Sequence, residues 1–464
     1  MHLLLLVDHK WRDLPGHAWL ALSAERRGHR IDLVRNGFHL DAAWRTRPDV
    51  LIVNHVLDVE SQRQAKLLAA AGTDTVVLPT EGILALQGAR DLHAGVGGDY
   101  AGVARFCVWN EPMRERMLEH RVMPSERIAV IGCPRFDFYQ PPVSSVVPDR
   151  RQAAARFQVD PARPTVLWAT NFCAASQFTR NPEFHRQDWA KLGLSRVFGD
   201  CDQHGLADLR CRDQSAAVMR DFVERNPEVQ LVVKPHPADD LTFFQAFVAS
   251  CPAGRVTLVK TAYIWEVLPL ADVLVKRSCT TGMEAWMRGL PTIELQPDPR
   301  RNYYCPEHAS GSHLVESGEQ LTERVRAVLA GEPLPAGLAE ARERFIARWC
   351  YRNDGRSTGR FLDVLDALAE ERRQAGRKPI TAGRPAPFGW RRKLRSRLLM
   401  AGDYWLHDRR LYGWFGRMDH QGRMDKWFTY RAAAAWRARL AGIQSHDAAA
   451  AHPVPSLSSL GGMA

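Results

Sequence analysis

Short apolar runs that end in polar residues constrain the fold of this chain more than any other feature of its sequence. Three such runs, 231–233, 272–275 and 291–295, stand within one stretch. Runs this short, rich in β-branched residues and bounded by breaks, are typical of buried parallel strands. Open α/β sheets bind their ligands at the carboxyl ends of such strands. The stretch therefore predicts a sheet edge suited to an anionic group such as a nucleotide phosphate.

The same strand pattern alternates with helical patterns along most of the chain. A first series begins at 3–7 and a second begins at 165–169. Alternation of this kind predicts doubly wound parallel α/β sheets with helices on both faces. Two such domains joined by a linker leave a cleft between them, which is a common position for a substrate. Residues 176–211 have weak periodicity, and we expect them to form an irregular insertion over this cleft.

These patterns divide the chain into two Rossmann-like domains and a C-terminal extension. A stretch rich in Pro, Ser and charged residues separates the domains. Ala, Ser, Pro and Gly dominate the last residues, which are expected to be disordered. The predicted boundaries are 1–140 for the first domain, 141–164 for the linker, 165–373 for the second domain, 384–440 for a basic aromatic helical extension and 446–464 for the disordered tail.

Nearly all of the net charge of +11 lies in the extension, where 384–440 contains 14 Lys and Arg against four Asp. Because the rest of the chain is close to neutral, nucleic acid is not an expected partner. A basic segment with interspersed Trp favours docking on an anionic membrane surface, where the acceptor of a transfer reaction would be lipid-linked. Helices packed on the body of the protein remain the alternative.

Cysteine spacing and motif content argue against several kinds of site. The nine cysteines are scattered and form no CxxC pair, and the sequence contains no HExxH, GxSxG or P-loop motif. A zinc ribbon or dithiol centre is therefore not expected. The absence of a disulfide framework suits a protein that works in a reducing compartment. No run approaches the ~18 apolar residues of a spanning helix. We expect a cytoplasmic protein that needs no metal or cofactor and is at most peripheral on the inner face of the plasma membrane.

Two polar motifs follow predicted strands of the second domain and suit a phosphate group. Prolines 235 and 237 form a rigid turn that presents the first motif at a strand end. The second motif offers hydroxyls and backbone N–H groups at a helix start. A surface turn and simple helix capping are the structural alternatives. The predicted nucleotide- or phosphate-binding residues are Lys234, His236, Ser278, Thr280, Thr281, Gly282 and Glu284, the last facing a ribose.

The first domain supplies a candidate base. Glu81 ends a predicted strand beside Gly82, which permits a close approach of another group. A carboxylate facing the cleft can deprotonate an acceptor hydroxyl, although an ordinary loop carboxylate fits the local sequence equally well. Four further residues follow strand ends and are predicted to contact substrate, with solvated or turn-forming roles as the alternative: Arg12, which suits an anionic group, Asn171, Gln296 and Arg300.

These residues together resemble the motifs of bacterial GT-B glycosyltransferases that make surface carbohydrate. The resemblance spans roughly 1–373 and is closest to the surface carbohydrate biosynthesis group and to transferases that use CMP-activated acidic sugars of the sialic acid or Kdo type. His236-Pro237 matches the HP motif of these enzymes, and Ser278, Thr280 and Thr281 match their serine/threonine motif. Gln296-Pro297 is similar to the QP motif of the Kdo-transferring relatives.

The resemblance implies roles for these motifs. The HP and serine/threonine motifs bind the nucleotide phosphate in such enzymes, and the histidine assists the leaving group. Their base comes from an acidic–acidic–glycine motif, which here is Thr80-Glu81-Gly82, so Glu81 is the remaining carboxylate. Stretches 10–14 and 132–137 are also similar to the surface carbohydrate group.

The sequence thus predicts a metal-independent glycosyltransferase. A sugar would pass from a nucleotide donor, CMP-linked by resemblance, to a glycan or lipid-linked acceptor, with His236 and Glu81 as catalytic residues. Two alternatives remain open. One is transfer of a polyol phosphate such as glycerol phosphate from a CDP donor. The other is a non-catalytic scaffold of a glycan assembly complex, which the threonine at position 80 favours.

Overall fold

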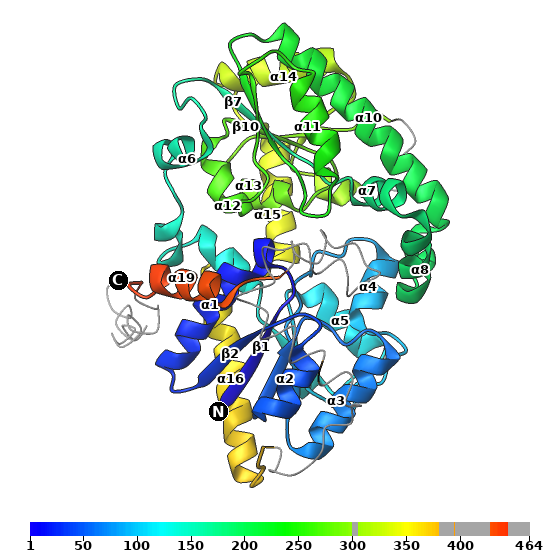
Figure 1. The fold of residues 1–464 in the computed structure, drawn as a ribbon, viewed down its shortest axis with the longest axis vertical. Helices are drawn as coiled ribbons and strands as arrows, with labels where there is room; N and C mark the ends of the chain where they lie inside the picture. Colours follow the sequence, from blue (N-terminus) through cyan, green and yellow to red (C-terminus); the bar gives the residue numbers. More distant parts are fainter. Residues whose placement is uncertain (299–304, 380–393, 395–426, 444–464) are drawn as a thin grey trace, which may run out of the picture.

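The computed structural model describes residues 1–298, 305–379, 394 and 427–443. Its described residues form two lobes, each built around a parallel sheet of six strands (Figure 1). The strand order is β2-β1-β3-β4-β5-β6 in the first sheet and β12-β11-β10-β7-β8-β9 in the second. In both sheets the order reverses near the middle, as in doubly wound folds. The predicted α/β class with two Rossmann-like domains is confirmed.

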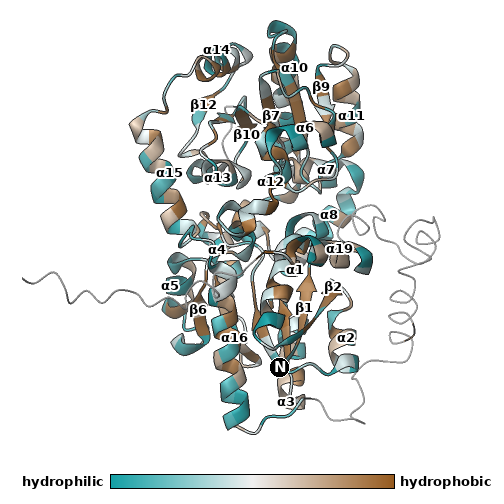
Figure 2. Cartoon of the chain, turned by 90° about the vertical axis from the view of Figure 1, so that its left-hand side faces the viewer, coloured by the Kyte–Doolittle hydropathy of each residue, from teal (hydrophilic) through white to brown (hydrophobic). Residues whose placement is uncertain are grey.

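The first lobe buries its strands on both faces. Two hydrophobic clusters, one on each face, hold strand side chains against helices. Figure 2 shows the strands as hydrophobic elements, with hydrophilic colour concentrated on the outer helices. The strands are β1 (His2–Val7), β2 (Arg30–Arg35), β3 (Val50–Val53), β4 (Asp74–Val77), β5 (Val103–Val108) and β6 (Ile128–Val130), and the helices are α1 (Lys10–Arg26), α2 (His39–Thr46), α3 (Val59–Ala71), α4 (Gln87–Ala94) and α5 (Glu111–Glu119).

The second lobe repeats this arrangement, with the three runs of the opening stretch as β8, β10 and β11. Its strands are β7 (Thr165–Ala169), β8 (Gln230–Lys234), β9 (Val256–Leu258), β10 (Val273–Lys276), β11 (Thr292–Leu295) and β12 (His313–Val315). Its helices are α7 (Cys173–Arg180), α8 (Pro182–Leu192), α9 (Ser195–Phe198), α10 (Cys201–Arg225), α11 (Leu241–Ala249), α12 (Ile264–Val267), α13 (Thr281–Trp286) and α14 (Gly318–Leu329).

The prediction of an irregular insertion at 176–211 is wrong, because this segment is helical. Asn181 caps α8 by accepting a hydrogen bond from the Phe184 backbone, and Asp200 caps α10 in the same way. Gly193 ends α8 in the left-handed conformation. The periodicity is weak in the sequence because these breaks divide the segment into helices that point in different directions.

Several elements connect the lobes. The predicted linker follows a short 3-10 helix, η2 (Pro134–Tyr139), and contains a second one, η3 (Val143–Val146), and helix α6 (Arg150–Phe157). On the return path, α15 (Ala336–Trp349) leads from the second lobe to α16 (Ser357–Gln374). The buried face of α16 packs on the first sheet (Figure 1). The predicted second domain extends to residue 373 and therefore includes most of α16, although this helix packs on the first lobe.

The described part of the predicted extension packs on the body of the protein. Helix α19 (Tyr430–Leu440) lies along α1 (Figure 1). Trp436 contacts the rings of Tyr263 and Trp265 from the second lobe, at centroid distances of 5.3 and 5.6 Å. This part therefore follows the packed-helix alternative. Most of 384–426 and the predicted disordered tail lie outside the described residues. Within the described ranges no helix is long and apolar enough to cross a membrane.

Candidate functional site

His236 stands in the loop at the carboxyl end of β8, as the sequence predicts. Its Nδ1 accepts a hydrogen bond from the Ala238 backbone at 3.1 Å, and the Cys173 thiol lies 2.9 Å from the same nitrogen. A backbone N–H can only donate, so Nδ1 is the unprotonated nitrogen of the neutral ring and Nε2 carries the hydrogen. This tautomer presents Nε2 as a hydrogen-bond donor, which suits a phosphate oxygen.

Asp239 fixes the loop that carries His236, a role that its place in the sequence does not reveal. Its carboxylate accepts from the backbone of His236 at 3.1 Å, from the backbone of Phe172 at 2.8 Å and from the Thr170 hydroxyl. The loops after β7 and β8 are thereby tied together. Burial raises the pKa of Asp239 to about 7.

Lys234 ends β8 below this loop and is buried. Its ammonium donates to the Pro235 carbonyl at 3.0 Å. Burial lowers the pKa of Lys234 to about 8, so the side chain still carries a positive charge at neutral pH. The position is compatible with electrostatic support of an anion at the sheet edge, and the predicted direct contact with phosphate stays a prediction.

The loop between β10 and α13 is braced from below by a fully buried ion pair of Lys276 and Glu294. Glu294 also accepts from the backbone of Ser278, which has a positive φ of 41°. The Ser278 hydroxyl accepts from the Cys305 backbone at 3.1 Å. A Cβ on Gly282 would lie 2.4 Å from Lys276 Cε, so this glycine makes room for the buried lysine.

The two threonines of this loop are less constrained. Thr280 precedes α13 but makes no side-chain capping bond, so the simple capping alternative is not observed. The Thr281 hydroxyl lies 3.2 Å from the Cys279 thiol. Their hydroxyls remain candidates for a phosphate, as the sequence predicts, whereas the Ser278 hydroxyl already has a backbone partner.

Glu284 does not have the environment expected for a ribose ligand. Its carboxylate accepts from the Tyr139 hydroxyl and lies 3.7 Å from the Arg135 guanidinium. Both partners belong to η2, outside the second sheet, and only 6% of the Glu284 side chain is exposed. The carboxylate therefore joins the two lobes, and we assign it to that contact in place of the ribose.

The other predicted substrate contacts in the second lobe have mixed outcomes. Gln296 is buried, where it accepts from Arg277 and donates to the Asp298 carbonyl, each at 3.0 Å. This internal pairing leaves it away from a substrate. Asn171 lies in the loop after β7, and its side-chain oxygen is 3.4 Å from the Cys173 thiol, close to His236. Arg300 lies outside the described residues.

Glu81 and Arg12 form one cluster in the first lobe. The carboxylate of Glu81 accepts from Arg12 at 2.9 Å, and the same guanidinium contacts Asp8 at 2.7 Å and Asp13 at 2.8 Å. Arg12 also donates to the Thr80 hydroxyl at 2.9 Å. The sequence predicts that Arg12 holds an anionic substrate, but these carboxylates already surround it. Arg12 instead orients Glu81.

The position after Glu81 has no room for a side chain, and glycine occupies it. A Cβ at this position would lie 2.3 Å from the Trp109 ring. The predicted close approach at this glycine is thus made by an indole of the same lobe. Any larger side chain would displace the loop that carries Glu81.

The candidate base and the candidate phosphate ligand belong to different lobes, since Glu81 follows β4 and His236 follows β8. Desolvation raises the pKa of Glu81, but the charges of Arg12, His93 and His236 together bring it below its usual value. Because 59% of the Glu81 side chain is exposed, the direct contact with Arg12 carries more weight than burial. His236 of the second lobe is among the groups that lower the Glu81 pKa. Glu81 is thus ionised at neutral pH, as a base must be.

Replacing Arg12 with glutamine should raise the pKa of Glu81. The substitution removes the positive charge that stabilises the carboxylate and leaves the opposing effect of desolvation in place. Carboxyl ¹³C NMR with labelled glutamate measures this pKa without a substrate. The matched control is Arg63→Gln, which removes an exposed arginine from its pair with Glu60. An unchanged Glu81 titration in Arg12→Gln would contradict the orienting role.

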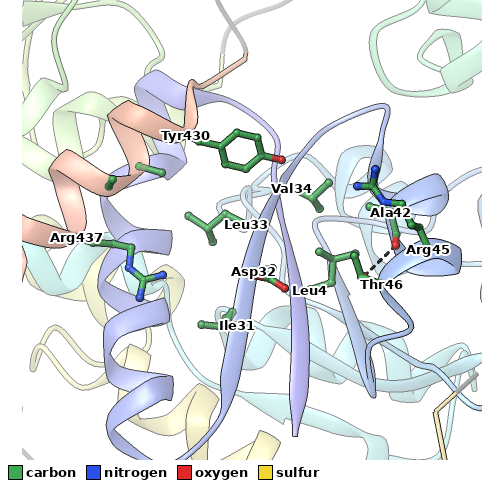
Figure 3. A pocket seen from close by; sticks show the side chains of 12 residues that line it. Leu4, Ile31, Asp32, Leu33, Val34, Ala42, Arg45, Thr46, Tyr430 and Arg437 are labelled. Carbon is green, nitrogen blue, oxygen red and sulfur yellow. Dashed lines mark hydrogen bonds between the residues drawn. The ribbon is translucent and has the colours of Figure 1, made fainter. Parts of the chain in front are cut away.

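Two cavities in the described part of the chain lie apart from this cluster. One, of about 570 Å³, opens between β1, β2, α2 and α19, with Tyr430 and Arg437 on one wall (Figure 3). The other, of about 580 Å³, lies between α4, α5 and the end of α15. Neither is lined by His236 or Glu81. Within the described ranges no group of three or more His, Cys, Asp and Glu residues is arranged to hold a metal ion.

Comparison with known proteins identifies the fold. No protein-family model matches the chain, and no curated protein does either. Among solved structures, the wall teichoic acid polymerase TagF aligns with a TM-score of 0.52 at 11% identity, covering 81% of this chain and 90% of that one. A putative UDP-N-acetylglucosamine 2-epimerase from Listeria monocytogenes gives 0.51 at 13% identity, covering 80% and 97%.

A UDP-GlcNAc 2-epimerase from Neisseria meningitidis, bound to UDP-GlcNAc, aligns similarly. Its TM-score is 0.50 at 12% identity, covering 80% of this chain and all of that one. At these identities the likeness establishes the fold alone. The chain has the GT-B arrangement of two facing Rossmann-like lobes.

Proposed function

We propose that this chain is a glycosyltransferase that moves a sugar from a nucleotide donor to a hydroxyl of a surface glycan. Two positioned groups support the proposal: Glu81, which Arg12 holds in the first lobe, and His236, whose ring is fixed at the carboxyl end of β8 with Nε2 as the donor. One side offers an ionised carboxylate and the other an N–H donor. By resemblance the donor is CMP-linked, of the Kdo or sialic acid type.

In this mechanism the two lobes have separate tasks. Glu81 accepts the proton of the acceptor hydroxyl while the acceptor oxygen bonds to the anomeric carbon of the donor. The bond from that carbon to the phosphate oxygen breaks at the same time. His236 Nε2 and the hydroxyls of Thr280 and Thr281 bind the departing phosphate, and the charge of Lys234 supports it. The negative charge that grows on the phosphate is thus met by donors already in place.

Transfer of a polyol phosphate from a CDP donor is the second candidate. Its support is the likeness in fold to the wall teichoic acid polymerase TagF. The same phosphate-binding loops would serve, and only the bond that breaks would differ. We also propose a cytoplasmic location at the inner membrane face through 384–426, which sedimentation with anionic liposomes tests.

A donor screen separates these functions. The full chain is incubated with CMP-sialic acid, CMP-Kdo, CDP-glycerol and UDP-GlcNAc, together with lipid-linked and soluble glycan acceptors, and products are followed by mass. We expect a product heavier by one sugar and release of CMP. A gain of one glycerol phosphate would favour the polyol reaction. Failure of CMP, CDP and UDP to bind in calorimetry would support the non-catalytic scaffold and contradict transfer.

A further inference from the structure

The first-lobe side of the cleft carries more negative than positive charge. Asp8 and Asp13 share one guanidinium with Glu81, so three carboxylates surround the single charge of Arg12. Asp8 also influences the titration of Glu81, which places its charge close to the candidate base. The cluster therefore retains about two negative charges at the point where an acceptor hydroxyl must arrive.

Neighbouring groups in the described part of the chain do not cancel this excess. Desolvation lowers the pKa of each of His17, His55 and His93, so these rings are neutral at pH 7. Arg135 is matched by Glu284 of the other lobe. Lys10 is the first residue of α1, and its ammonium lies over the Trp11 ring at 5.2 Å. Counting Lys10 in full still leaves the cluster negative.

The second-lobe side of the cleft instead offers a hydrogen-bond donor and a positive charge. His236 offers an N–H donor, and Lys234 adds a buried positive charge beneath it. Under the proposed function, the anionic part of the donor belongs to this second-lobe side. An anion that approached from the acceptor side would have to stand beside Asp8 and Glu81, where like charges repel at short range and screening by salt is incomplete.

We propose that this face selects an acceptor whose reacting end is uncharged, with Asp8 as a specificity-determining residue. The favoured class is a neutral sugar hydroxyl, and the disfavoured class is a sugar with a carboxylate or phosphate beside the reacting hydroxyl. The inference rests on the proposed function and narrows it. A chain of acidic sugars or phosphodiesters would bring an anion to this face at every addition, so processive extension of a polyanion is not expected.

The local charge can be measured without knowing any substrate. His55 is exposed in the loop after β3, and the charges of Asp8, Glu81 and Arg12 act on its pKa. In a His55→Cys variant of the full chain, rates of modification by a cationic and an anionic methanethiosulfonate are compared, each divided by its rate with free mercaptoethanol. Peptide mass identifies reaction at position 55. We expect the cationic reagent to be favoured by about tenfold.

Asp8→Asn in the same background should reduce that ratio several-fold, because it removes one of the two excess charges. Asp99→Asn, on an exposed aspartate paired with Lys66, is the matched control and should leave the ratio unchanged. Equal modification rates, or a ratio that does not respond to Asp8→Asn, would overturn the inference and leave the proposed transferase intact.

The second arm uses matched acceptors, one ending in a neutral hexose and one in the corresponding uronic acid. We expect kcat/KM to favour the neutral acceptor by about tenfold, and Asp8→Asn to narrow the difference. Preference for the uronic acid would overturn the inference. A cationic preference in the reagent assay with no transfer from any donor would instead contradict the proposed function, and the acceptor inference with it.

Discussion

Replacing His236 with alanine is expected to lower kcat for donor turnover by about 100-fold or more. The alanine lacks the Nε2–H donor that the Ala238 contact fixes in the wild type, and the leaving phosphate loses a partner whose contribution grows as the bond breaks. Nucleotide affinity should fall less than kcat, since the remaining loop groups still bind the phosphate. Release of the nucleotide, followed by chromatography, gives the rate.

The control for this substitution is His120→Ala, which removes an exposed histidine at the end of α5. Its turnover should match the wild type. A His236→Ala enzyme with normal turnover would remove His236 from the mechanism. Urea denaturation of both variants distinguishes a chemical effect from unfolding of the loop that Asp239 holds.

Replacing Glu81 with glutamine is expected to lower kcat by about 100- to 10,000-fold. Glutamine keeps the shape of the side chain and can still accept from Arg12, but it cannot take the proton of the acceptor. Nucleotide binding in calorimetry should be unchanged, because the phosphate-binding loops belong to the other lobe. In the wild type, protonation of Glu81 should lower activity only in acid, since the pKa of Glu81 lies below its usual value.

Glu60→Gln, at an exposed carboxylate paired with Arg63, is the matched control and should be fully active. If Glu81→Gln turns over normally, the base lies elsewhere, and Asp8 is the next carboxylate to test because it shares Arg12. Weaker nucleotide binding in Glu81→Gln would also contradict the division of tasks between the lobes.

The local sequence pattern was sufficient to predict the two sheets and the position of the candidate phosphate site. The runs that became β8, β10 and β11 are short, apolar and bounded by breaks, and they were predicted because a buried parallel strand needs apolar residues on both faces. His236 could be found because it follows such a strand directly and stands between prolines.

Contacts between distant parts of the chain could not be predicted in this way. Glu284 lies in α13 and Gln296 directly follows β11, as expected, but their partners Tyr139 and Arg277 come from other segments and decide where the side chains point. The amphipathic pattern of α16 shows that one face is buried without showing which sheet covers it. Likewise, the sequence places Arg12 in a position suited to binding an anion, but in the structure three carboxylates contact its guanidinium.

A structure of the protein with bound CMP tests the central claim most directly. We expect a phosphate oxygen within hydrogen-bond distance of His236 Nε2, with Thr280 and Thr281 around the same phosphate and Glu81 facing it from the first lobe. A nucleotide bound in either of the two peripheral cavities, or with its phosphate turned away from His236, would contradict the account.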